Sequence, residues 1–170
     1  MKVDQSLKLA RSERGSLVAD LASAQMTQDE WEDALAERMG VSYPLLSKTL
    51  LRQYISALGL DRTSSLDEVN AALQALIAAE PQDLPEMLLI GQMLATNRTA
   101  LDLMASANKT SFPETQKTYL GLAIRLLRLS AQQVDALGRY RRKGKQEIRI
   151  EKVIIDGQSQ AIFGLNQERG

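Results

Sequence analysis

The 170-residue chain contains no cysteine and no histidine. Without cysteine there is no disulfide, no thiol nucleophile and no cysteine-ligated zinc or iron–sulfur site. Histidine is the commonest general acid or base and the commonest transition-metal ligand, so its absence removes the usual parts of an enzyme site. The sequence also has no phosphate-binding loop, dinucleotide fingerprint or nucleophile elbow. We therefore expect a protein that is not an enzyme, with no metal, no cofactor and no evident small-molecule substrate.

Net charge and long apolar runs are lacking as well. The 21 basic and 21 acidic residues cancel, so no overall charge draws the chain to nucleic acid or to a membrane surface. No apolar stretch approaches the roughly 18 residues of a membrane span, and the first residues carry no apolar signal core. We expect a cytoplasmic protein without a membrane partner.

Leucine and alanine dominate what is present, and aromatic residues make up only 4% of the chain. Apolar residues recur at helical spacing and predict helices over residues 5–24, 28–39, 43–58, 66–79, 84–108 and 113–142. Four of these begin with a capping-box pattern, a small polar residue followed three positions later by glutamate: Thr27 and Glu30, Ser65 and Glu68, Asp83 and Glu86, Ser111 and Glu114. The sequence therefore predicts a mostly α protein built as a helical bundle.

The last two predicted helices are long and are joined by only a few residues, which predicts an antiparallel pair. Shorter helices precede them, and the character of the chain changes near residue 80. We therefore expect an N-terminal helical module over residues 1–80, a long helical hairpin over residues 81–144 and a C-terminal tail over residues 145–170.

The last predicted helix carries a seam whose members alternate by three and four: Tyr119, Leu122, Leu126, Leu129, Gln133, Ala136 and Tyr140. Gln133 is the polar member of this seam. Such a residue can set register or oligomeric state at a cost in stability. The alternative is a bundle position whose amide reaches solvent or a neighbouring side chain.

Residues 145–165 predict a C-terminal β-hairpin. Asp156-Gly157 favours a two-residue type I′ turn, in which both central residues need positive φ. One face of the hairpin is then apolar: Ile148, Ile150, Ile154, Ala161, Phe163 and Leu165. A lone hairpin is marginal in water and its edges are open, so this face must pack on its own helices, on a second copy or on a partner. We favour a homo-oligomer, with candidate interface residues Ile148, Ile150, Ile154, Phe163, Leu165 and Gln133.

Residues 35–50 are similar to the helix-turn-helix of lactose-repressor-type DNA-binding proteins. Ala36 would pack between the two helices, Gly40 would form the turn and Ser42 would cap the second helix. The side chains able to bond base edges or phosphates would then be Tyr43, Ser47 and Lys48. The preceding helix is acidic, and the alternative is a plain packing corner between two helices.

A short basic run follows in the last predicted helix: Arg139, Arg141, Arg142, Lys143 and Lys145. It could bind phosphates, with Tyr140 available to stack on a base. Alternatively, cations in a last helical turn complement the helix dipole, and Gly144 ends the helix. Together with the helix-turn-helix pattern, this run supports a second hypothesis, a DNA-binding regulator.

Several segments of the C-terminal half carry a family resemblance: LPEMLLIGQM at residues 84–93, RLLR at 125–128 with Gln132 and Gln133, ALGRYRRKGKQ at 136–146 and GQSQAIFG at 157–164. Together, over residues 83–165, they resemble a family of uncharacterised bacterial proteins found in prophages and plasmids. That family has a His-Val-x-Val strand and a Gly-Gly-Gln-Ala turn in its β tail, whereas this chain has Lys-Val-Ile-Ile and Gly-Gln-Ser-Gln-Ala. The resemblance implies that the long helices and the tail belong together and that a mobile element is their setting. Our first hypothesis is therefore a non-enzymatic, self-associating helical protein of a mobile element that acts by protein–protein assembly.

Overall fold

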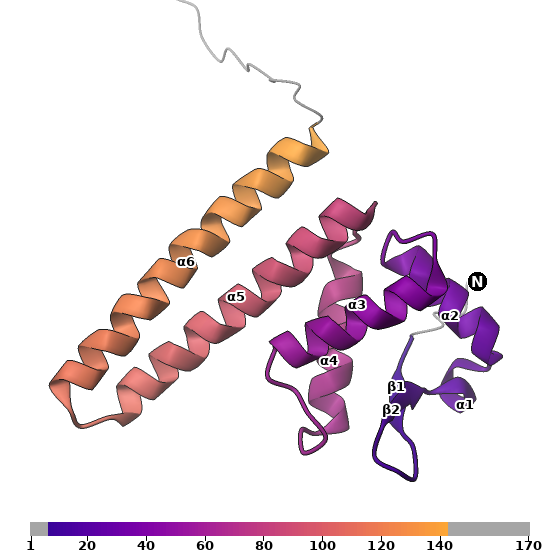
Figure 1. Cartoon of the computed structure of the whole chain (residues 1–170), viewed down its shortest axis with the longest axis horizontal. Helices are drawn as coiled ribbons and strands as arrows, with labels where there is room; N and C mark the ends of the chain where they lie inside the picture. Colours follow the sequence, from indigo (N-terminus) through magenta and orange to yellow (C-terminus); the bar gives the residue numbers. More distant parts are fainter. Residues whose placement is uncertain (1–6, 143–170) are drawn as a thin grey trace, which may run out of the picture.

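The computed structural model describes residues 7–142 and is mostly helical over this range, as predicted (Figure 1). The helices are α1 (Leu21–Ala24), α2 (Gln28–Arg38), α3 (Pro44–Ala57), α4 (Leu66–Ala78), α5 (Leu84–Lys109) and α6 (Pro113–Arg141). Two short strands, β1 (Leu9–Arg11) and β2 (Leu17–Ala19), precede them. The predicted tail hairpin lies outside the described residues, and so do six of the candidate site residues with it: Ile148, Ile150, Ile154, Phe163, Leu165 and Lys145. Lys143 also lies outside this range.

The prediction of one helix over residues 5–24 is wrong for most of that range. The two strands pair antiparallel there, with Leu9 opposite Ala19. The chain reverses at Gly15, whose φ is +75°, and the Gly15 N–H donates to the Ser12 carbonyl at 2.8 Å. Only α1 at the end of the range is helical, because the apolar residues before it are divided between two strands and their turn.

Two amide side chains of α4 hydrogen-bond the backbone of β1 and of Leu7 just before it. Asn70 accepts the Leu9 N–H at 2.7 Å and donates its own N–H to the Leu9 carbonyl at 3.0 Å. One turn later, Gln74 donates to the Leu7 carbonyl at 2.7 Å. Since an open strand edge leaves backbone groups unpaired, these amides take the place of a third strand and fix the hairpin to α4.

One continuous core joins the β-hairpin to α2, α3, α4 and the first half of α5. Its largest fully buried side chains include Leu35, Met39, Val69, Leu73, Leu76 and Ile90. Met87 and Ile90 of α5 belong to this core. The sequence-based boundary near residue 80 therefore separates segments that pack together.

Two of the four predicted capping boxes form reciprocally, those of Thr27 with Glu30 and of Ser65 with Glu68. Only one of the two hydrogen bonds of the third box forms. Asp83 accepts the Glu86 N–H at 3.0 Å, but the Glu86 carboxylate accepts from Gln82 and Arg141 and not from the Asp83 N–H. The fourth prediction is wrong, because the N-cap of α6 is Phe112 and no side chain caps this helix.

The α5–α6 hairpin is the antiparallel pair expected from the sequence, and α5 lies between α6 and the N-terminal helices (Figure 1). The outer half of the hairpin projects beyond the rest of the described chain. Of the 29 residues of α6, only Ala123 and Gln133 are buried. None of the helices between residues 7 and 142 has the length and apolar character needed to cross a membrane.

Candidate functional site

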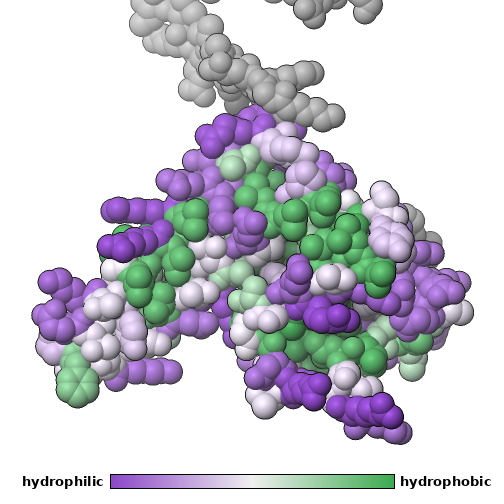
Figure 2. Space-filling model, viewed as in Figure 1, coloured by the Kyte–Doolittle hydropathy of each residue, from purple (hydrophilic) through white to green (hydrophobic). Residues whose placement is uncertain are grey.

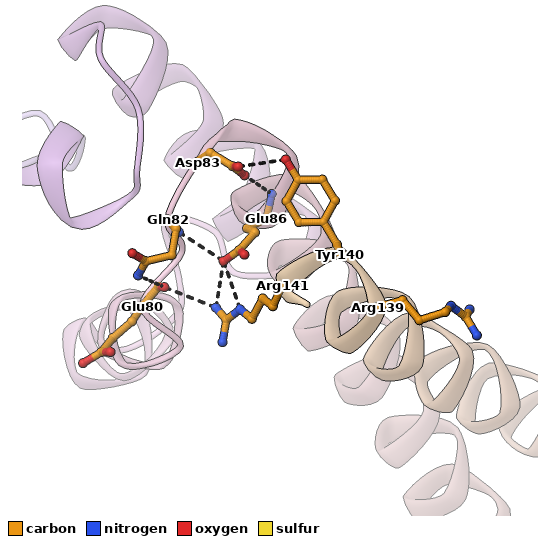
Figure 3. A pocket seen from close by; sticks show the side chains of 7 residues that line it. All are labelled: Glu80, Gln82, Asp83, Glu86, Arg139, Tyr140 and Arg141. Carbon is orange, nitrogen blue, oxygen red and sulfur yellow. Dashed lines mark hydrogen bonds and ion pairs between the residues drawn. The ribbon is translucent and has the colours of Figure 1, made fainter. Parts of the chain in front are cut away.

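The end of α6 meets the start of α5 in a polar hollow (Figure 3). Arg141 donates from Nε and Nη2 to one carboxylate oxygen of Glu86, at 3.1 and 2.8 Å. The same guanidinium nitrogen, Nη2, donates to the carbonyls of Ala79 at 3.0 Å and Glu80 at 3.2 Å. One arginine side chain therefore connects the end of α6 with the first turn of α5 and with the loop before it.

Glu86 is the acidic partner in this hollow, and its side chain is only 4% exposed. Its carboxylate also accepts the Gln82 N–H at 3.1 Å. A buried carboxylate is costly unless it is paired and hydrogen-bonded, and here both conditions are met. Beside it, the Tyr140 hydroxyl donates to Asp83 at 2.8 Å, and this bond to a carboxylate raises the pKa of Tyr140.

The predicted basic run is thereby divided. Arg141 is engaged within the protein, whereas Arg139 points away from Glu86 (Figure 3) and is exposed. Arg142 is exposed as well. One of the cations predicted to bind phosphate therefore holds α6 in place.

The predicted helix-turn-helix is formed by α2, α3 and the turn between them. Gly40 lies in that turn with φ of +64°. A Cβ atom on Gly40 would lie 2.6 Å from both the Pro81 carbonyl oxygen and the Asp83 nitrogen. Only glycine fits here, because the turn packs directly against the loop that leads into α5.

The three residues predicted to face DNA have very different environments. Tyr43 is 62% exposed, whereas Ser47 is fully buried and its hydroxyl donates to the Pro44 carbonyl at 2.7 Å. Lys48 donates to Glu32 of α2 at 2.7 Å, and this bond lowers the pKa of Glu32. The second helix of the motif thus uses Ser47 and Lys48 for contacts within the protein.

A different surface stands out on α6. Five small or apolar residues, which we call the outer stripe, repeat at spacings of four and three: Leu120, Ile124, Leu127, Ala131 and Val134. Ile124 is 49% exposed and Val134 is 52% exposed. The buried Ala123 and Gln133 belong to a neighbouring row on the same helix. Each member of the outer stripe comes one residue after a member of that row. Because successive helical residues lie about 100° apart, the outer stripe lies to one side of the row that faces α5. Leu127 is half-buried and the other four members are exposed.

Sequence reasoning missed the outer stripe because two rows on α6 have the same spacing and only burial distinguishes them. The predicted seam includes Leu122 and Leu129, which are 42% and 43% exposed. It also includes Gln133, which is 9% exposed and whose Oε1 has no hydrogen-bond partner among the described residues. The predicted seam therefore mixes one buried position with half-buried and exposed ones.

Between residues 7 and 142, no cluster of three or more acidic side chains is placed to hold a metal ion. No protein-family model matches this chain, and no curated protein or solved structure matches it. Its function must therefore be inferred from its own surfaces.

Proposed function

We propose that this protein is a non-enzymatic assembly protein that associates with copies of itself through the α5–α6 hairpin. The observation that carries the proposal is the outer stripe, an apolar row along a 29-residue helix in which only two residues are buried. Figure 2 shows apolar side chains on the visible face of this hairpin, bordered by polar ones.

The spacing of the outer stripe suits a second helix. Apolar residues that alternate by three and four are the pattern by which helices interlock side by side. Large contiguous apolar patches are uncommon on the surfaces of monomers and mark interaction sites. A stripe on one helix pairs with the same stripe on a second copy across a two-fold axis. Two such hairpins would then form a four-helix bundle.

The predicted tail hairpin and the family resemblance are consistent with self-association through α6. The apolar face predicted for the tail hairpin, with Ile150 near its centre, would add to the same assembly. The mobile-element setting is an expectation from the family resemblance. The DNA-binding alternative has less support, because Ser47, Lys48 and Arg141 all make contacts within the chain.

The test is the mass of the full chain by light scattering across a range of concentrations. We expect the wild type to be oligomeric and the Ile124→Lys/Val134→Lys variant to be monomeric. Each lysine would place a charge in the apolar contact that the outer stripe makes with a second copy. Its circular dichroism and melting temperature should remain close to those of the wild type at low concentration, since both positions are exposed in the single chain.

Two further variants make the result specific. Leu45→Lys changes an equally exposed leucine on α3 and should leave the mass unchanged. Ile150→Asp measures what the tail contributes. A wild type that is monomeric at all concentrations, or a double variant that keeps the wild-type mass, would refute assembly through the outer stripe.

A further inference from the structure

A second hollow lies between the β-hairpin, α2 and α3, on elements that do not carry the outer stripe. Its volume is about 280 Å³. Leu9, Ala19, Leu51 and Ile55 contribute apolar surface to it. Ligand pockets are concave, mostly apolar and equipped with a few polar groups that orient the ligand. This hollow is near the lower end of their size range, which favours a small ligand.

A tryptophan forms part of the wall of the hollow. Trp31 lines it and is 3% exposed. The indole Nε1 of Trp31 is buried, and no group among the described residues accepts its hydrogen bond. Leaving a buried N–H unpaired costs free energy that a partner would recover. Because Nε1 has almost no exposed surface, a ligand in the hollow would contact the ring of Trp31 and not this donor.

The hollow also has a cation at its exposed side. Lys48 and Arg52 lie one turn apart on α3 and both line the hollow. Lys48 is neutralised by Glu32 at 2.7 Å. Arg52 is exposed and has no ion pair between residues 7 and 142. The net charge beside the apolar wall is therefore positive, and it favours an anionic head group.

We propose that this hollow binds a small amphipathic carboxylate. Its hydrocarbon part packs against the apolar wall that includes Leu51 and Ile55, and Arg52 pairs with its carboxylate. The ring of Trp31 is part of the same wall. This assignment is independent of assembly through α6, because none of its residues belongs to the outer stripe.

The test uses octanoate and the full chain. Trp31 is the single tryptophan of the chain, so its indole N–H gives one resonance in a proton–nitrogen correlation spectrum. We expect octanoate to shift this resonance saturably, because the ligand would pack beside the indole ring. Acetate, which lacks the hydrocarbon part, should cause no shift, and octanol, which lacks the charge, should bind about tenfold more weakly.

Variants locate the site. Arg52→Gln should weaken octanoate binding about tenfold, whereas Arg62→Gln, at an exposed arginine of the loop before α4, should not change it. Ala19→Phe should abolish binding by filling the hollow, and the rest of its spectrum reports whether it is folded. Arg52→Gln keeps the proposal testable if Ala19→Phe does not fold.

Three results would overturn the proposal. The first is the absence of a saturable shift of the indole resonance in the wild type. The second is equal binding of octanoate and octanol that Arg52→Gln leaves unchanged, which would indicate unspecific partition. The third is binding that occurs only after residues 1–6 are deleted, because the hollow would then belong to the chain's own first residues.

Discussion

Arg141 at the end of α6 and Glu86 in the first turn of α5 form an ion pair between an exposed and a buried side chain. The Arg141 side chain is 40% exposed and that of Glu86 is 4% exposed. The same guanidinium donates to the carbonyls of Ala79 and Glu80, which follow α4. The contact therefore fixes the position at which the α5–α6 hairpin leaves the N-terminal helices.

Arg141→Gln should lower the free energy of unfolding by about 1–2 kcal/mol. Loss of a buried ion-pair partner costs more than this, but the exposed guanidinium is partly screened by solvent. Urea unfolding of Arg141→Gln, Glu86→Gln and the double variant measures the coupling between the two side chains. The double variant should lose less than the sum of the single losses.

Arg139→Gln, the exposed neighbour, should stay within about 0.5 kcal/mol of wild type. Strictly additive losses would contradict a direct contact.

Gly40→Ala should be among the most damaging single substitutions in the described chain. A non-glycine residue at positive φ costs about 1–2 kcal/mol, and at Gly40 the new Cβ would also overlap the backbone at Pro81 and Asp83. We expect a total loss of about 3 kcal/mol or more. Gly59→Ala is the matched control, because Gly59 has φ of +69° but open space where its Cβ would be. It should lose only the conformational part, about 1–2 kcal/mol. Equal losses in urea unfolding would show that the turn does not depend on its close approach to Pro81.

Local signals in the sequence predict most of the helices. The starts of α2 and α4 follow from Thr27 and Ser65, whose capping boxes involve only residues within the same turn. The stretch before α1 could not be predicted in this way, because its strand β1 is completed by the side chain of Asn70 in α4. The partner of Glu86 could not be predicted either. The sequence pattern predicts a local cap, but the Glu86 carboxylate accepts a hydrogen bond from Arg141, 55 residues later.

In the candidate sites, too, local features could be predicted from the sequence and contacts between distant residues could not. A helical projection places Tyr43, Ser47 and Lys48 near one another, and it is correct that Tyr43 is exposed. It cannot show that Ser47 bonds within its own turn or that Lys48 meets Glu32 of α2. The outer stripe of α6 was missed for a related reason. Spacing shows that α6 has an apolar row, but packing decides which face of the helix contacts α5.

Asn70→Asp should detach β1 from α4. A carboxylate cannot donate to the Leu9 carbonyl and would repel it, so the strand loses one hydrogen bond and gains an unfavourable contact. We expect a loss of about 1–3 kcal/mol and faster hydrogen exchange of the Leu9 amide. Asn97→Asp makes the same change at an exposed position of α5 and should do neither. Unchanged exchange at Leu9 would mean that the strand is held without Asn70.

Tyr54 should give the protein an alkaline limit to its stability. Its hydroxyl donates to the Ala72 carbonyl at 3.2 Å inside the core, and burial raises the pKa of Tyr54 to about 12. A tyrosine in an unfolded chain has a pKa of about 10. The folded state therefore holds the phenol proton more tightly, so this contribution is complete below pH ~10 and is lost as the pH rises through ~12.

The two-unit difference corresponds to roughly 2–3 kcal/mol, and the Tyr54→Phe variant isolates it. At pH ~8 this variant should be less stable than wild type by about 1 kcal/mol, because the Ala72 carbonyl loses its donor. Between pH ~10 and ~12 its unfolding free energy should fall less steeply than that of the wild type, since phenylalanine has no proton to release. Tyr43→Phe removes an exposed phenol and controls for the substitution itself. Urea unfolding at several pH values provides the comparison, and parallel curves for wild type and Tyr54→Phe would show that the buried phenol does not set the alkaline limit.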